Sequence, residues 1–187
     1  MGDEQGKVME YFPRLWNLAK ALFIVCLILL PFSPQAKESR LSDSTITKEV
    51  QQKIRNNLFY TVFDWVTVST HDGNVILHGY VHLPWDKAFF EKISKGVEGV
   101  NSVTDKIKKV YGPDELRYKA AEAIYGSPDF QKYAFMKDPP VHIIVISNRV
   151  ILIGAVASKA ERSWANLLVQ WRTNAFKVKN DLAIENG

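Results

Sequence analysis

Apolar and polar residues alternate over residues 73–81, which is the pattern of a strand with two unlike faces. The same pattern returns 75 residues later, over residues 148–156. Val103 and Ile107 also have apolar counterparts at this offset, so the repeated unit is a whole small domain rather than a turn motif. The matched pairs are Val75 with Val150, Leu77 with Leu152, Gly79 with Gly154, Val81 with Val156, Val103 with Val178 and Ile107 with Leu182.

A helix is predicted at the start of the first repeat, because apolar residues recur at every fourth position on one face. Either Ser44 or Thr45 can cap this helix. Residues 65–69 then have strand composition, and residues 71–74 predict the turn of an antiparallel hairpin. The apolar helix positions are Ile46, Val50, Ile54 and Leu58.

A second helix and a last strand complete the first repeat. Pro84 ends the hairpin, and Asp86 can cap the second helix. The last strand spans residues 100–110, and its inward face is either the set Val103, Asp105 and Ile107 or the flanking set. The inward stripe of the second helix is Phe90, Ile93, Ser94 and Val97.

The second repeat restates this order of elements and carries one insertion. Two helices over one face of a three-stranded sheet form an α+β sandwich, and the strand-helix-strand crossover makes the sheet mixed. The sequence therefore predicts two tandem α-β-β-α-β domains, at residues 44–112 and 113–187. The elements expected in the second are a helix over 114–124, an insertion with a short helix over 125–140, strands over 141–147 and 150–157, a helix over 159–172 and a strand over 177–184.

An uninterrupted apolar run over residues 21–30, preceded by Arg14 and Lys20, indicates that residues 1–36 are an export signal. Residues 37–43 are polar and are expected to be a linker. Three interpretations of the apolar run stay open: a signal cleaved after Ala36, an uncleaved inner-membrane anchor over residues 15–32, and a buried helix of a cytosolic protein.

Composition and charge narrow the classes of partner. The chain has 187 residues, 47% of them hydrophobic, and a net charge of +4. The charge is dispersed and forms no basic stripe, so nucleic acid is not expected as a partner, whereas anionic lipid headgroups remain compatible. Cys26 is the single cysteine, which rules out an intramolecular disulfide. Each repeat is small, so we expect the repeats to pack on each other, on a second copy or on a partner.

Glycine marks four positions with an expected structural role. Gly79 and Gly154 fall within strands, where glycine weakens the strand unless a neighbour approaches the backbone closely. We expect that neighbour to be the second helix of each repeat. Gly73 lies in the hairpin turn and Gly99 ends a helix.

No catalytic, cofactor or metal site is predicted. The sequence contains no zinc-protease, paired-cysteine, nucleophile-elbow or phosphate-loop motif. His78 and His82 share a strand face, but four strand residues span roughly 13 Å, too far for two ligands of one ion unless His71 joins one of them. We expect these strand histidines to face solvent.

Trp164 and Trp171 lie seven residues apart on the helix over 159–172, which also carries Arg162 and Arg172. An aromatic and basic helix face is typical of contact with a membrane interface or a partner, so these four residues are the candidate contact site. Core packing competes for the tryptophans, because together with Leu167 and Leu168 they match the i, i+3, i+4, i+7 spacing of a buried stripe.

The strand V-x-L-x-G-x-V, the helix exit Val97-Glu98-Gly99-Val100 and the strand start Val103-Thr104-Asp105-Lys106-Ile107 resemble the BON domain, named for bacterial OsmY and nodulation proteins. The resemblance covers residues 44–185 and is more divergent in the second copy, where Asn148 replaces the turn glycine. It implies an exported envelope protein without a catalytic centre or cofactor, associated with phospholipid surfaces and with osmotic or envelope stress. We therefore expect a periplasmic, non-enzymatic protein that binds an anionic phospholipid surface; the alternative is a protein-protein adaptor or a holdase-like chaperone that does not bind lipid.

Overall fold

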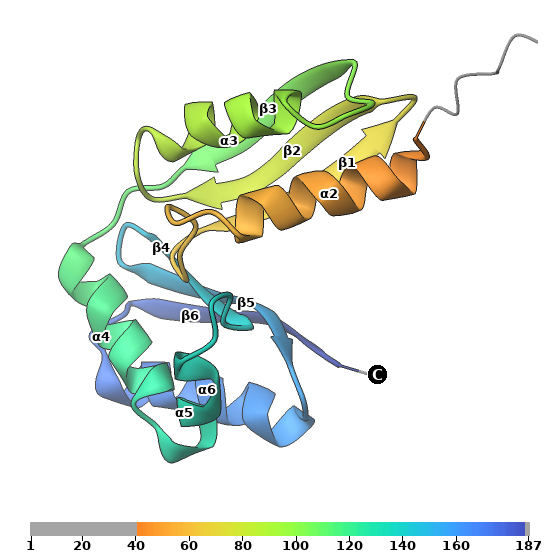
Figure 1. Ribbon diagram of the computed structural model, residues 1–187. Coiled ribbons are helices and arrows are strands. Elements are labelled where there is room, and N and C mark those ends of the chain that lie inside the picture. Colours follow the sequence, from red (N-terminus) through yellow and green to blue (C-terminus); the bar gives the residue numbers. More distant parts are fainter. Residues whose placement is uncertain (1–40, 186–187) are drawn as a thin grey trace, which may run out of the picture. The chain divides into compact units, whose positions relative to one another are not determined.

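The computed structural model describes residues 41–185, which form two repeats of α+β structure (Figure 1). Each repeat contains one three-stranded mixed sheet packed against helices, as the sequence pattern predicts. The first repeat consists of α2 (Asp43–Arg55), β1 (Trp65–His71), β2 (Asn74–Val81), α3 (Asp86–Lys95) and β3 (Ser102–Lys109). The second consists of α4 (Asp114–Tyr125), α5 (Pro128–Ala134), β4 (Val141–Ile146), β5 (Arg149–Val156), α6 (Lys159–Arg172) and β6 (Lys177–Ile184).

The two sheets have the same topology. In each, the middle strand pairs antiparallel with the strand before it and parallel with the strand that follows the helix. The registers also correspond, because Val66 pairs with Gly79 in the first sheet and Val141 with Gly154 in the second. The duplicated sequence pattern therefore reflects a duplicated fold.

Each repeat has its own hydrophobic core between its sheet and its helices. In β3, Ile107 is buried and the Asp105 side chain is only 6% exposed, so the inward set is Val103, Asp105 and Ile107. Lys87 Nζ lies 3.6 Å from an Asp105 carboxylate oxygen, which accounts for a carboxylate on that face. The first core comprises Ile46, Val50, Ile54, Tyr60, Val66, Val75, Leu77, Val81, Phe90, Val97 and Ile107.

Two sequence-based details of α2 are wrong. The helix is capped by Ser42, whose Oγ accepts from the Thr45 amide at 3.2 Å, and not by Ser44 or Thr45. Leu58, predicted on the buried stripe, is 91% exposed. The helix ends at Arg55, so a residue three positions further along no longer lies on its inward face.

The expected neighbour of the strand glycines was also wrong. A Cβ at Gly79 would lie 1.8 Å from Trp65 O, and one at Gly154 would lie 2.0 Å from Pro140 O, so the close approach is made by the antiparallel partner strand or the residue before it, and not by a helix. Both glycines have φ near +130°, which side-chain-bearing residues rarely adopt. At the hairpin turn, Asp72 and Gly73 both have positive φ, as a tight type I′ turn requires.

His142, on β4, is 1% exposed. Its ring lies 5.5 Å from the Tyr60 ring and 5.1 Å from the Trp65 ring, between centroids. The amide of Ile143 donates to Val62 O at 2.7 Å. Residues of the first repeat therefore contact β4 directly, which explains why this strand is buried on both faces.

No helix within residues 41–185 is long and apolar enough to cross a bilayer. The expected signal or anchor at residues 1–36 and most of the expected linker lie outside the described residues.

Candidate functional site

Helix α6 carries the four residues predicted as a contact site, and its own sequence sets its start. Ser158 is the N-cap, and its Oγ accepts from the Glu161 amide at 3.1 Å. Glu161 Oε2 in turn accepts from the Ala157 amide at 3.0 Å. The pair is similar to a capping box, except that the glutamate bonds the amide of the residue before the N-cap, and it fixes the first turn of the helix.

The two tryptophans lie together on one flank of α6. Their ring centroids are 6.0 Å apart and the planes make an angle of 84°. Trp164 is partly buried and packs against the core, whereas Trp171 is 69% exposed. The core and interface interpretations therefore divide between the two residues: Trp164 packs and Trp171 faces solvent.

Arg162 does not lie with the tryptophans. Its guanidinium donates to Asn180 O on β6 at 3.4 Å, and Asn180 Nδ2 donates to Arg162 O at 2.7 Å. Arg172 is exposed at the last residue of the helix. The structure thus brings Trp164 and Trp171 together and places Arg162 on the flank that faces β6.

A groove runs along each flank of α6. The groove toward β6 has a volume of about 640 Å³ and is lined by Lys159, Arg162 and Asn180 among others. The groove toward α5 has a volume of about 440 Å³ and is lined by Trp164 and Glu161. Ser163 and Leu167 line both grooves and so separate the groove with Lys159 and Arg162 from the groove with Trp164.

Glu161 also ties α5 to α6. Lys132 Nζ donates to its Oε1 at 2.7 Å, and the Tyr133 hydroxyl donates to its Oε2 at 3.2 Å. Burial alone would raise the pKa of Glu161, but these bonds and the Ala157 amide together hold the pKa below its ordinary value. The short helix of the insertion also packs inward, because Phe130 is fully buried in the second core.

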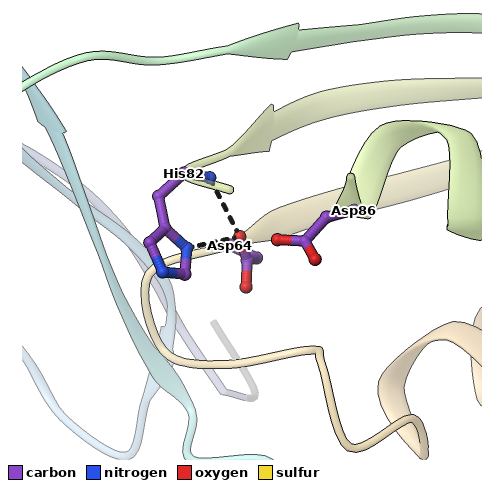
Figure 2. A group of neighbouring side chains, drawn as sticks. All are labelled: Asp64, His82 and Asp86. Atoms are coloured by element: carbon purple, nitrogen blue, oxygen red, sulfur yellow. Dashed lines mark hydrogen bonds and ion pairs between the residues drawn. The ribbon is translucent and has the colours of Figure 1, made fainter. Parts of the chain in front are cut away.

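A second group of polar side chains meets at one end of the first sheet, and the sequence analysis did not single it out (Figure 2). Asp64 directly precedes β1, His82 directly follows β2 and Asp86 is the first residue of α3. Because β1 and β2 are antiparallel, the start of one strand and the end of the other are adjacent. One ligand atom from each of the three residues lies within 4.8 Å of the others.

Asp64 is fully buried and well satisfied. Its Oδ2 accepts from the Thr61 amide at 3.0 Å and from the Thr61 hydroxyl at 2.8 Å. Its Oδ1 accepts from the His82 amide at 3.1 Å and lies 3.0 Å from His82 Nδ1. The His82 side chain is only 13% exposed, so the expectation that it faces solvent is wrong.

Asp86 is fully buried, and neither of its carboxylate oxygens has a hydrogen-bond partner among the described residues. It does not cap α3 as predicted, since the N-cap is Trp85 and no side chain bonds the first amides. Burial and then the negative charge of Asp64 raise the pKa of Asp86 to about 6. His82 and the Leu83 amide, which lies near the carboxylate without reaching hydrogen-bond geometry, offset this only in part.

The second repeat lacks this group. At the offset of 75 residues, Pro139 stands in place of Asp64 and Ala157 in place of His82, while Glu161 corresponds to Asp86. The spacing of residues 64, 82 and 86 matches no ligand motif. The sequence therefore indicates the group only through the difference between the two repeats at these positions.

Residues 42–110 match the model of the BON domain family. The matched segment runs from the N-cap of α2 to the residue after β3 and so includes the whole first repeat. The similarity to the BON domain family therefore covers the first repeat. The match does not extend into the second repeat.

No curated protein matches the chain. Among solved structures, the chain is similar to the C-terminal domain of CdsD, a structural protein of the type III secretion system of Chlamydia trachomatis. The identity is 12%, the coverage is 78% of this chain and 68% of that chain, and the TM-score is 0.34. A second CdsD structure gives 13% identity, coverage of 90% and 75%, and a TM-score of 0.36.

Proposed function

We propose that this chain is an exported, non-enzymatic envelope protein that binds anionic phospholipid surfaces. The match of residues 42–110 to the BON domain family supports this proposal. In this proposal residues 113–187 are a second, divergent BON unit and provide the contact surface. The protein would act in maintaining the envelope under osmotic or other stress.

The exposed aromatic and basic surface of α6 carries the proposal. Trp171 is 69% exposed, and Phe176, in the loop after the helix, is 83% exposed. Aromatic side chains of this kind partition into the interface between water and lipid.

Helix α6 also carries three cations, of which Arg172 directly follows Trp171 while Lys159 and Arg162 line the groove toward β6. Within residues 41–185, Lys159, Arg162 and Arg172 form no ion pair with a carboxylate. Each cation near an anionic surface contributes about 1 kcal/mol to binding. The groove toward β6, which Lys159 and Arg162 line, is therefore a suitable place for phosphate headgroups.

Co-sedimentation with vesicles tests this function. Residues 40–187, which form one compact unit, are mixed at low salt with vesicles of phosphatidylcholine alone or with phosphatidylglycerol. Near-UV circular dichroism checks that this segment is folded. We expect binding only to the anionic vesicles, weakened by Trp171→Ala and by the double change Arg162→Gln and Arg172→Gln.

Trp85→Ala is the matched control, because Trp85 is 55% exposed but lies on the first repeat. It should bind vesicles as the parent does. Absence of binding to anionic vesicles, or equal weakening by Trp85→Ala and Trp171→Ala, would contradict a lipid-binding role for α6.

The adaptor or holdase function has one observation in its favour. Leu58 is 91% exposed and Phe59 is 47% exposed in the loop after α2, and Phe59 packs edge to face on Phe89 of α3. Trp85, the N-cap of α3 one turn before Phe89, is a further exposed aromatic residue of the first repeat. This alternative would be favoured if the protein captured an envelope protein, if Phe59→Ser abolished that capture, and if vesicle binding did not depend on lipid charge.

A further inference from the structure

We propose that Asp64, His82 and Asp86 bind one divalent first-row transition-metal ion, such as Zn²⁺ or Mn²⁺, in the first repeat. Two carboxylates and one imidazole are a donor set that suits these ions. The inference concerns the first repeat alone and does not depend on lipid binding by the second.

The distances fit such an ion. Two cis ligands of an ion with bonds of roughly 2.1 Å lie about 3.0 to 3.5 Å apart. Asp64 Oδ1 and His82 Nδ1 are 3.0 Å apart, so this pair already has the required separation. One Asp86 oxygen lies within 4.8 Å of a ligand atom of each of the other two residues, which leaves an adjustment of about 1 Å for an ion to bind all three.

The state of Asp86 is the independent observation that points to a ligand. A fully buried carboxylate without any hydrogen-bond partner is costly and rare in folded proteins. Figure 2 shows its side chain directed toward Asp64, another fully buried acid. A divalent cation between the two would satisfy both oxygens and neutralise the pair.

The surroundings hold the ligands in place. The Thr61 amide and hydroxyl fix Asp64 Oδ2, which leaves Oδ1 to face His82 and Asp86. The Phe63 ring packs edge to face on the His82 ring, with centroids 5.6 Å apart. Outer contacts of this kind orient ligands in known metal sites. With the ion bound at Nδ1, the imidazole carries its remaining proton on Nε2.

An ion at this site would add the start of α3 to the residues before β1 and after β2, which the hydrogen bond from the His82 amide to Asp64 already joins. Three protein ligands also leave at least one position of the ion for water. The predicted role is a structural clamp on the loop that presents Trp85.

The test uses the full-length protein in a mild detergent, freed of metal with a chelator and titrated with ZnCl₂ or MnCl₂. Isothermal titration should show one ion per chain, and the thermal midpoint should rise by several degrees with the ion. Titration with CoCl₂ should give visible absorption bands that change in His82→Asn.

Asp86→Asn is the decisive variant, because Asp86 makes no hydrogen bond and its replacement leaves the contacts of Asp64 intact. It should remain folded by near-UV circular dichroism and lose the metal-induced rise. His78→Asn is the control, because His78 is exposed on the same strand. Equal metal response in Asp86→Asn, His82→Asn and the parent, or no binding at 100-fold excess of ion, overturns the proposal.

Discussion

Trp171 packs edge to face on Trp164, so an exposed aromatic residue contacts a partly buried one that packs against the core. The inner ring fixes where the outer ring stands. Exposed side chains in contact with a buried neighbour lose less conformational freedom on binding, which favours a defined contact surface.

The two tryptophans should therefore respond differently to truncation. Trp164→Ala removes partly buried packing and should lower the free energy of unfolding by about 2 to 3 kcal/mol. Trp171→Ala should change it by less than ~1 kcal/mol while reducing vesicle binding. Urea unfolding followed by circular dichroism measures the first effect. Equal destabilisation by both changes would show that Trp171 packs as Trp164 does.

The strand glycines should tolerate no side chain. Gly79→Ala places a Cβ 1.8 Å from Trp65 O at a φ of +133°, and we expect a loss of about 3 kcal/mol or more of stability. Gly96→Ala is the matched control, because the nearest atom to its Cβ lies 3.6 Å away. That variant should lie within about 1 kcal/mol of the parent in urea unfolding.

These glycines also show which parts of the fold could be predicted from the sequence. The periodic apolar positions and the repeated offset were enough to predict the order of elements and the two mixed sheets, because strand alternation and helix stripes are local signals. The cause of each glycine was misjudged, since a backbone dihedral and the approach of a neighbouring strand leave no local pattern. Leu58 was misplaced for a different reason: the periodic stripe was extended past the basic last turn and the C-cap Asn56, which mark the end of α2 at Arg55.

The group of Asp64, His82 and Asp86 lay beyond sequence reasoning for another reason. Its members come from the ends of two strands and the start of a helix, and the strand pairing alone brings the first two together. Asp86 in particular has the sequence position of a helix cap, which is the commoner role for such a residue. Only its burial distinguishes it.

Glu161 should make stability depend on pH. Its pKa lies below the ordinary value in the folded protein, so its contribution is present at neutral pH and is lost as pH falls below about 4.5, through the folded-state pKa. Glu161→Gln should lower the urea midpoint at pH 7, and the difference from the parent should shrink toward pH 3.5. Glu122→Gln, at an exposed residue of α4, should show no such convergence. If the difference in urea midpoint between Glu161→Gln and the parent stays constant across this range, the bonds from Lys132 and Tyr133 do not stabilise the fold through the charge of Glu161.

Asp86 should lower stability when no metal is present. At pH 8, in the presence of a chelator, Asp86→Asn should raise the free energy of unfolding by about 1 to 3 kcal/mol, because it removes a buried charge that lacks a partner. Thermal unfolding monitored by circular dichroism measures this. Asp72→Asn, whose side chain is 83% exposed in the parent, should leave the midpoint unchanged. A less stable Asp86→Asn would indicate that the carboxylate already has a favourable partner.

The segment that joins the repeats determines where a fragment of the second repeat can begin. Tyr111 O accepts from the Ser147 amide at 2.7 Å, and a Cβ at Gly112 would lie 2.6 Å from a methyl carbon of Val145. Two residues that precede α4 are thus built into the β4–β5 hairpin. A fragment that starts at Pro113 would leave the tip of this hairpin without its carbonyl partner, so expression of the second repeat alone should begin at Tyr111 or earlier. Insertions between residues 110 and 113 would act as changes to the fold of the second repeat and not as a longer tether.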